Sequence, residues 1–264
     1  MIEFFKELTS NWWGILLLAV ACAVVWLLLS AVFYKIFFKR FYDVVLSGLA
    51  LLILSPVMLV LIVVGAIKMK GNPFFTQMRP GKISRKTGKE KIFKLLKFRT
   101  MTCEKDENGN LLPDEKRLTK YGRILRSTSL DELPELINIF LGDMSIVGPR
   151  PMLVRDMTFM SDSVRARHKI RGGLTGLAQV SGRNNITWEE KFAYDLRYLE
   201  KISLWKDLGI IFKTALKVLK RSDVEREGTV SDIDYGDWLL QEGAVSQEEY
   251  DAKQAEAKQL LGTK

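Results

Sequence analysis

The sequence predicts an α/β fold that is mainly helical, with a small β element and a membrane-anchored N-terminal part. Three observations predict this class. No charged residue occurs from Leu8 to Tyr34, two short segments of the body alternate apolar and polar residues, and much of the remainder repeats apolar residues at three- and four-residue spacing. With 264 residues, the chain is long enough for one sizeable domain plus appendages.

The uncharged stretch from Leu8 to Tyr34 is long enough to cross a bilayer. Twenty-odd helical residues, at about 1.5 Å each, span the roughly 30 Å hydrocarbon layer. Trp12 and Trp13 near its start suit the membrane–water interface, and basic residues follow its end. Because positive charge favours the cytoplasmic side, we expect residues 1–38 to form a transmembrane segment with the rest of the chain in the cytoplasm.

A second uncharged run, residues 44–67, contains Ser55-Pro56 in its middle. A proline inside a helix removes a backbone hydrogen bond and bends the helix. Basic residues flank the run on both sides, so a crossing in either direction would leave positive charge outside. We expect a re-entrant helix that enters and leaves on the cytoplasmic side. A kinked transmembrane span is the alternative.

The body of the chain, from about Gly71 to Arg221, is expected to be one cytoplasmic domain. The segments that start at Pro73 and Lys91 alternate apolar and polar residues and predict a pair of strands. Apolar residues from Trp205 to Leu219 recur at helical spacing with lysines between them. This amphipathic helix either faces the core or lies in the membrane interface.

The C-terminal part differs in charge from the body. The whole chain has 40 Lys and Arg against 31 Asp and Glu, but the residues from Asp223 onward include 11 acidic and four basic ones. We expect an acidic linker over residues 223–237 and a short helical module over 238–264, whose Ser246 and Glu249 have capping-box spacing. A basic body beside membrane segments indicates anionic lipid or phosphorylated substrates, and no nucleic acid.

Two distant cysteines and a single histidine exclude a disulfide scaffold and a Cys- or His-based metal cluster. The densest candidate for chemistry is therefore a carboxylate pair, Asp131 and Glu132. Ser129 and Glu132 have the spacing of a capping box and predict a helix start, although Pro134 makes that start irregular or shifted. One carboxylate could attack phosphorus while the other holds Mg²⁺. A plain acidic first turn is the alternative.

Two other segments could bind a ligand. Arg150 lies in a Gly-Pro-Arg-Pro turn, where its planar guanidinium suits bidentate phosphate binding, or is a solvated arginine on a structural turn. The stretch from Ile170 to Asn184 contains four glycines, which allow close approach of the backbone to a ligand. His168, beside it, is expected to be structural.

Four segments, in this order, resemble the bacterial sugar transferase family, the monotopic phosphoglycosyl transferases. They are Lys94-Leu-Leu-Lys-Phe-Arg-Thr-Met, Arg126-Ser-Thr-Ser-Leu-Asp-Glu-Leu-Pro, Gly142-Asp-Met-Ser-Ile-Val-Gly-Pro-Arg-Pro and Gly173-Leu-Thr-Gly-Leu-Ala-Gln-Val-Ser-Gly-Arg-Asn. The resemblance covers residues 39–222, and the family's Ser-Pro-broken re-entrant helix is similar to residues 44–67.

The resemblance implies an activity. A UDP-sugar would donate a phosphosugar to polyprenyl (undecaprenyl) phosphate and release UMP, at the cytoplasmic face of the bacterial inner membrane. This is the first membrane step of surface glycan biosynthesis, so later glycosyltransferases of the same pathway would be further partners. Two alternatives stay open: an inactive membrane scaffold of this fold, and a hydrolase of the polyprenyl-diphosphate sugar.

The resemblance also implies roles for single residues. Asp131 would be the nucleophile that carries a covalent phosphosugar, and Glu132, together with Asp131, would bind Mg²⁺. Arg126 and Lys97 would hold the carboxylates and the lipid phosphate. The implied substrate-binding positions are Arg150, Arg183, Asp195 and Asp207.

Overall fold

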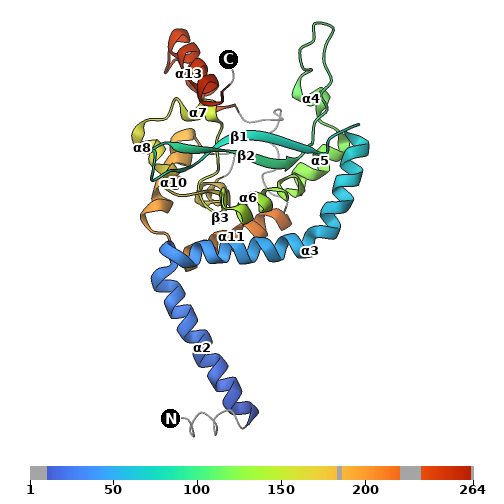
Figure 1. Ribbon diagram of the computed structural model, residues 1–264. Helices are drawn as coiled ribbons and strands as arrows, with labels where there is room; N and C mark the ends of the chain where they lie inside the picture. The colour runs from blue at the N-terminus through green and yellow to red at the C-terminus, as the bar shows by residue number, and fades with distance from the viewer. Residues whose placement is uncertain (1–10, 183–185, 221–232, 263–264) are drawn as a thin grey trace.

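The computed structural model describes residues 11–182, 186–220 and 233–262. It is mainly helical, as predicted, and contains two small sheets (Figure 1). In chain order the elements are α2 (Trp12–Phe33), the π-helical turn η1 (Tyr34–Phe38), α3 (Lys39–Lys68), β1 (Phe74–Ile83), β2 (Glu90–Phe98), α4 (Asp114–Arg117), α5 (Lys120–Ser127), η2 (Leu130–Glu132), α6 (Glu135–Leu141), β3 (Met144–Val147), α7 (Val154–Met157), α8 (Asp162–Arg165), η3 (Ala166–Lys169), β4 (Gly172–Thr175), α9 (Leu177–Ser181), α10 (Trp188–Glu200), α11 (Leu204–Lys220), α12 (Tyr235–Gln241) and α13 (Gln247–Leu260).

The N-terminal helices form one continuous apolar segment. Together α2, η1 and α3 run from Trp12 to Lys68, and this segment is long and apolar enough to cross a membrane. In Figure 1, α2 projects away from the body. Its side chains are almost all exposed, so α2 has the length and surface of a membrane-embedded helix. Tyr42 of α3 links this helix to α2. Its hydroxyl accepts from Trp26 Nε1 at 3.0 Å and lies 2.8 Å from the Ser30 hydroxyl.

Helix α3 is bent but not interrupted. It contains Pro56, the residue type that bends helices, and Figure 1 shows α3 running beneath the body and then turning up along one side. The Ser55 hydroxyl donates to the Leu52 carbonyl at 2.8 Å, the backbone acceptor that Pro56, lacking an N–H, cannot serve. The predicted break between two helices is therefore a bend within one.

One face of α3 packs on the body and helps to build its core. Ala50, Leu51 and Leu54 contact a buried cluster that β2, α6 and β3 supply; its members are Phe93, Leu95, Leu136, Ile139 and Met144. Further along α3, Met58 packs with Phe98 of β2 and Leu125 of α5. The opposite face of α3 stays exposed, so the helix covers the body on one side only.

Of the two sheets, the sequence predicted one and not the other. Strands β1 and β2 form the expected antiparallel pair, with Phe74 opposite Phe98 and a register shift between Pro80 and Ile83. The parallel pair β3–β4 was not predicted, because its strands have four residues each and lie inside glycine-rich sequence. A Cβ on Gly173 would lie 2.1 Å from the Gly148 nitrogen, so the loop after β3 can approach β4 only with glycine there.

The C-terminal module begins earlier than predicted. Helix α12 starts at Tyr235, inside the range expected to be an acidic linker, and the part of that range up to residue 232 lies outside the described residues. Ser246 caps α13 as predicted, since its hydroxyl accepts from the Glu249 backbone nitrogen at 3.1 Å. In Figure 1, α13 lies beside α7, so the module packs on the body.

Candidate active site

Asp131 and Glu132 lie in a tight turn between α5 and α6. Ser129 adopts a left-handed backbone conformation with φ of 55°, and its side chain makes no capping hydrogen bond. The predicted Ser129–Glu132 capping box is therefore wrong: a short 3₁₀ turn follows, and α6 starts only after Pro134. This arrangement places the two carboxylates at the tip of the turn and Glu135 in the first turn of α6.

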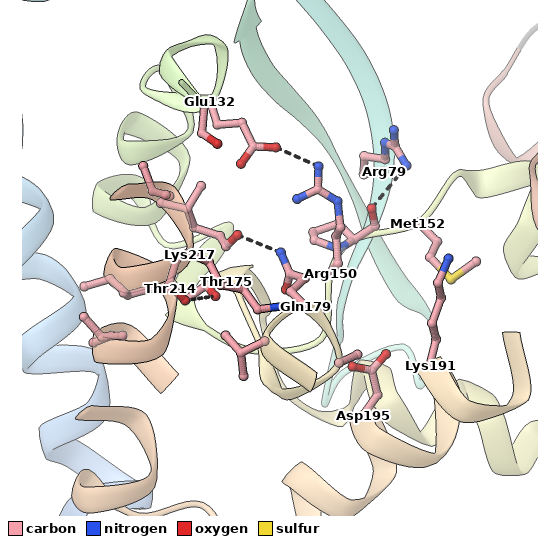
Figure 2. A pocket seen from close by; sticks show the side chains of 18 of the residues that line it. Arg79, Glu132, Arg150, Met152, Thr175, Gln179, Lys191, Asp195, Thr214 and Lys217 are labelled. Carbon is pink, nitrogen blue, oxygen red and sulfur yellow. Dashed lines mark hydrogen bonds and ion pairs between the residues drawn. The ribbon is translucent and has the colours of Figure 1, made fainter. Parts of the chain in front are cut away.

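Two cations from distant elements converge on Glu132. Lys97 Nζ, from β2, lies 2.8 Å from Glu132 Oε1 and 3.2 Å from Glu135 Oε1. Arg150 Nη2, from the loop after β3, lies 2.7 Å from the same Glu132 oxygen (Figure 2). The fold thus brings together Lys97, Glu132 and Arg150, as the sequence predicted, and adds Glu135.

The two glutamates respond oppositely to this environment. Burial would raise the pKa of Glu132, but the charges and hydrogen bonds of Arg150 and Lys97 outweigh it and hold the pKa well below its usual range. Burial, followed by the charge of Glu132, raises the pKa of Glu135 to about 7. The site therefore keeps Glu132 ionised and Glu135 close to half protonated at neutral pH.

Asp131 is half-buried beside Glu132. Burial and the neighbouring charge of Glu132 raise its pKa, while Lys97, Arg126 and Arg150 act in the opposite direction. Arg126 is held by Thr100, whose hydroxyl accepts from Arg126 Nε at 3.2 Å. The predicted catalytic residues thus form one electrostatic group around Asp131.

A cavity of about 670 Å³ opens at this cluster. Glu132 and Arg150 line it, as do three cations that the sequence analysis did not single out: Arg79, Arg167 and Lys191. Apolar residues of α3 and α11 form another part of its wall; they are Ala50, Leu54, Ile211, Ala215 and Val218. The cavity can therefore accommodate an anionic group and an apolar group at once.

Asp195 also lines the cavity, but its carboxylate is engaged by Arg167. Arg167 Nη2 and Nε lie 2.6 and 3.0 Å from Asp195 Oδ2, and both side chains are buried. The same Arg167 donates to the Arg150 carbonyl at 2.8 Å, and Arg79 donates to the Pro151 carbonyl at 3.1 Å. These contacts fix the loop that presents Arg150, so Asp195 supports the site through Arg167.

Asp207 lies elsewhere, in a buried polar cluster at the base of α3. Its carboxylate accepts from Tyr34, Tyr198 and Lys39. The predicted substrate-binding Arg183 lies outside the described residues. His168 Nδ1 lies 3.2 Å from buried Glu90, which agrees with its expected structural role.

The carboxylates fit a hard divalent cation that is completed by substrate. Among residues 11–182, 186–220 and 233–262, no group of three or more His, Cys, Asp and Glu side chains is arranged to hold a metal ion. Mg²⁺, however, usually takes one or two carboxylates together with water and substrate phosphates. Asp131 and Glu132 supply carboxylate oxygens of that kind, and Lys97 and Arg150 both contact Glu132 through Oε1.

Comparison with known proteins shows to which protein family this chain belongs. A family model described as bacterial sugar transferase matches residues 34–221, which include the whole carboxylate cluster. The chain belongs to this bacterial sugar transferase family. It is an enzyme, a phosphoglycosyl transferase, and every predicted catalytic residue lies inside the matched range.

Three relatives illustrate the match. The chain is 42% identical over 193 residues to the uncharacterized sugar transferase EpsL of Bacillus subtilis (strain 168), covering 73% of this chain and 93% of that protein. It is 38% identical over 190 residues to the UDP-glucose:undecaprenyl-phosphate glucose-1-phosphate transferase of Klebsiella pneumoniae, covering 68% of this chain and 40% of that protein. A protein of the same name from Caulobacter vibrioides (strain ATCC 19089 / CIP 103742 / CB 15) is 36% identical over 191 residues, and the match covers 69% of each chain.

Proposed function

We propose that this sugar transferase moves a phosphosugar from a UDP-sugar to polyprenyl phosphate and releases UMP. The observation that carries the proposal is the Asp131–Glu132 turn, held by Lys97 and Arg150 at a cavity with both cationic and apolar walls. Such a cavity suits a diphosphate donor and a lipid phosphate acceptor. The names of the Klebsiella and Caulobacter relatives describe transfer of glucose 1-phosphate between UDP-glucose and undecaprenyl phosphate.

The proposed reaction has two displacements at one phosphorus atom. An Asp131 carboxylate oxygen attacks the phosphorus that carries the sugar, and the bond from this phosphorus to the UMP oxygen breaks. A phosphate oxygen of the polyprenyl phosphate then attacks the same phosphorus, and the bond to Asp131 breaks, which regenerates the carboxylate. Splitting the transfer in this way lets the soluble donor product leave before the lipid acceptor reacts.

The cations have a defined task in both steps. Phosphoryl transfer depends mainly on positioning and on stabilising charge at the transferring oxygens. Lys97 and Arg150 are in place to do so once substrate phosphate competes with Glu132 for them. Mg²⁺, held by Glu132 with Asp131, would supply further positive charge to the phosphates. Arg126 lowers the pKa of Asp131 and so favours the ionised nucleophile.

We further propose that α3 is re-entrant and that the body lies at the cytoplasmic face of the inner membrane. Both ends of α3 are tied to the same domain, which supports this topology. Near its start, Arg40 donates to the Ile139 carbonyl at 2.6 Å; near its end, the Tyr121 hydroxyl donates to the Leu61 carbonyl at 3.0 Å. A helix that crossed the bilayer would separate these two contacts by the membrane thickness.

Helix α11 supports the same placement. Its exposed apolar residues include Trp205, Phe212 and Leu219, with lysines beside them. An amphipathic helix with this surface is suited to lie in the interface. The adjoining apolar wall of the cavity, built from α3 and α11, would then face the side from which a lipid acceptor arrives.

The test is turnover by the purified full-length protein in lipid nanodiscs with Mg²⁺, UDP-sugars and undecaprenyl phosphate. We expect UMP release that depends on the acceptor over repeated turnovers, and exchange of labelled UMP into the UDP-sugar without it. Asp131→Asn should lose both activities, whereas Asp106→Asn, in the exposed polar loop, should keep them. Absence of turnover in the wild type would favour a scaffold, and release of sugar phosphate without acceptor would favour a hydrolase.

A further inference from the structure

The C-terminal module, residues 234–261, packs on the catalytic body through specific contacts. It lies beyond the range of the family match, which ends at residue 221. Arg155 of α7 forms ion pairs with Asp234 and Asp237, at the start of α12. The Gly236 nitrogen donates to buried Asp156 Oδ1 at 3.3 Å. The module is therefore part of the folded body.

The packing at Gly236 is too close for a side chain. A Cβ at this position would lie 2.6 Å from Phe159 Cε2. The Tyr250 ring of α13 also packs on Phe159, at 5.7 Å between centroids, and its hydroxyl donates to Asp237 Oδ1 at 2.5 Å. Both helices of the module thus contact Phe159, just after α7.

This docking brings α12 to the catalytic cavity. Asp234 is one of the residues that line the cavity, and its side chain remains 31% exposed. The next residue, Tyr235, packs its ring 5.5 Å from Trp188 and 5.0 Å from Phe192, measured between centroids. Trp188 and Phe192 line the same cavity. The module therefore contributes one wall residue and supports two others.

The Trp188 end of the cavity lies away from the Asp131–Glu132 turn. Lys191 Nζ sits 4.3 Å from the centroid of the Trp188 ring, which places these two side chains together. In Figure 2, Glu132 and Lys191 lie on opposite sides of Arg150. A donor whose phosphates lie between Glu132 and Arg150 would extend its remaining part toward Lys191 and Trp188.

The charge of Asp234 restricts what it can contact. An ionised carboxylate accepts hydrogen bonds and repels phosphate. Cationic side chains on the cavity wall, Arg150 among them, are the groups that attract phosphate oxygens. A carboxylate on the cavity wall next to Tyr235 instead suits a hydroxyl group, and carbohydrate rings are the hydroxyl-bearing parts of a nucleotide sugar.

We infer that the C-terminal module forms a wall of the donor site and that Asp234 is a specificity-determining residue that accepts a hydrogen bond from a carbohydrate hydroxyl of the donor. This inference rests on the proposed function. In this inference the Asp234 carboxylate accepts the hydrogen bond from the hydroxyl. Arg155 orients that carboxylate, and Tyr235 holds the Trp188 ring in place on the cavity wall. The hydroxyl belongs either to the transferred sugar or to the ribose, and the two sources give different binding patterns.

The test measures equilibrium binding of UMP and a panel of UDP-sugars to the full-length protein in nanodiscs, together with steady-state kinetics. Hydrogen bonds to a charged acceptor are roughly twice as strong as neutral ones, so removing the charge in Asp234→Asn should weaken binding of the preferred UDP-sugar about tenfold. The KM for polyprenyl phosphate should not change. An equal loss for UMP assigns the hydroxyl to ribose; an unchanged UMP affinity assigns it to the transferred sugar.

Asp237→Asn is the matched control, because Asp237 also pairs with Arg155 but contacts Tyr250 and is not among the cavity-lining residues. Its donor affinity should stay within about twofold of the wild type. Gly236→Leu, which displaces α12 from Phe159, should weaken donor binding as Asp234→Asn does. Unchanged donor affinity and sugar preference in Asp234→Asn would overturn the inference, as would an equal loss in Asp237→Asn. A wild type that binds UDP-sugar but forms no product would contradict only the proposed function.

Discussion

Lys39 Nζ lies 2.6 Å from Asp207 Oδ2, although 168 positions separate the two residues in the chain. Lys39 is the first residue of α3, and Asp207 lies in the first turn of α11. The hydroxyls of Tyr34 and Tyr198 also donate to Asp207, at 2.8 and 2.6 Å. This buried cluster joins the end of the N-terminal membrane helix to the catalytic body.

Breaking this pair should destabilise the protein. Removing one partner of a buried ion pair leaves an uncompensated charge and typically costs about 3–5 kcal/mol. Lys39→Met should therefore lower the free energy of unfolding by about that amount, read from denaturant unfolding in detergent. The matched control is Lys91→Met, whose partner Asp143 lies at 2.9 Å but whose side chain is 70% exposed; it should change stability by less than about 1 kcal/mol. Equal effects of the two variants would contradict the assigned role of Lys39.

Ser129 should be a strained position. A left-handed conformation costs a residue with a Cβ about 1 kcal/mol, and glycine avoids this cost. Ser129→Gly should therefore leave the melting temperature unchanged or raise it by a few degrees. Ser127→Gly, at the end of α5, should lower it, because glycine is a poor helix former. A lower melting temperature in both variants would mean that the turn before Asp131 is not left-handed.

Glu135 should make stability depend on pH. Its pKa rises from 4.5 to about 7 on folding, so the folded state retains a proton that the unfolded state has lost between these values. The resulting destabilisation is absent below pH 4.5, grows as pH rises toward 7, and is complete above it. Glu135→Gln should therefore raise the melting temperature at pH 8.5 more than at pH 5. An identical shift at both values would show that Glu135 has an ordinary pKa.

The two ends of α3 should lie on the same side of the membrane. A reporter inserted at Thr87, in the exposed turn between β1 and β2, should be active in the cytoplasm. A reporter at the N-terminus should be active outside, since α2 separates it from the body. Detection of the Thr87 reporter outside the cytoplasm would favour the kinked transmembrane span over the re-entrant helix.

The sequence predicted the helices, strands and helix caps that depend on residues near one another in the chain. The long uncharged run of α2, the alternation in β1 and β2, and the Ser246 cap of α13 follow from side-chain types that are near one another in the sequence. The Ser129 cap failed because its backbone is left-handed, which residue spacing does not reveal. The first residues of α12, Tyr235 to Asp237, were assigned to the acidic linker because Asp234 and Asp237 continue its acidic composition.

The site residues that lie within one sequence motif were predicted. Those that only the folded chain brings together were missed. Adjacent Asp131 and Glu132 and the Arg150 turn were recognisable in the sequence, and Lys97 followed from the family resemblance. Arg167 and Arg79 gave no signal, because their roles depend on carbonyl and carboxylate groups that lie far away in the chain. Asp207 was expected at the substrate, but its three partners come from η1, α3 and α10 and place it in the buried polar cluster at the base of α3.

The most direct test of the account is the mass of the protein after exposure to donor alone. The purified full-length enzyme, incubated with Mg²⁺ and its UDP-sugar but no acceptor, should gain the mass of one sugar phosphate, located on Asp131 by peptide mapping. It should release one UMP per protein and lose the added mass when polyprenyl phosphate is supplied. Rapid turnover with acceptor, but no adduct on Asp131 at any time without it, would contradict the account.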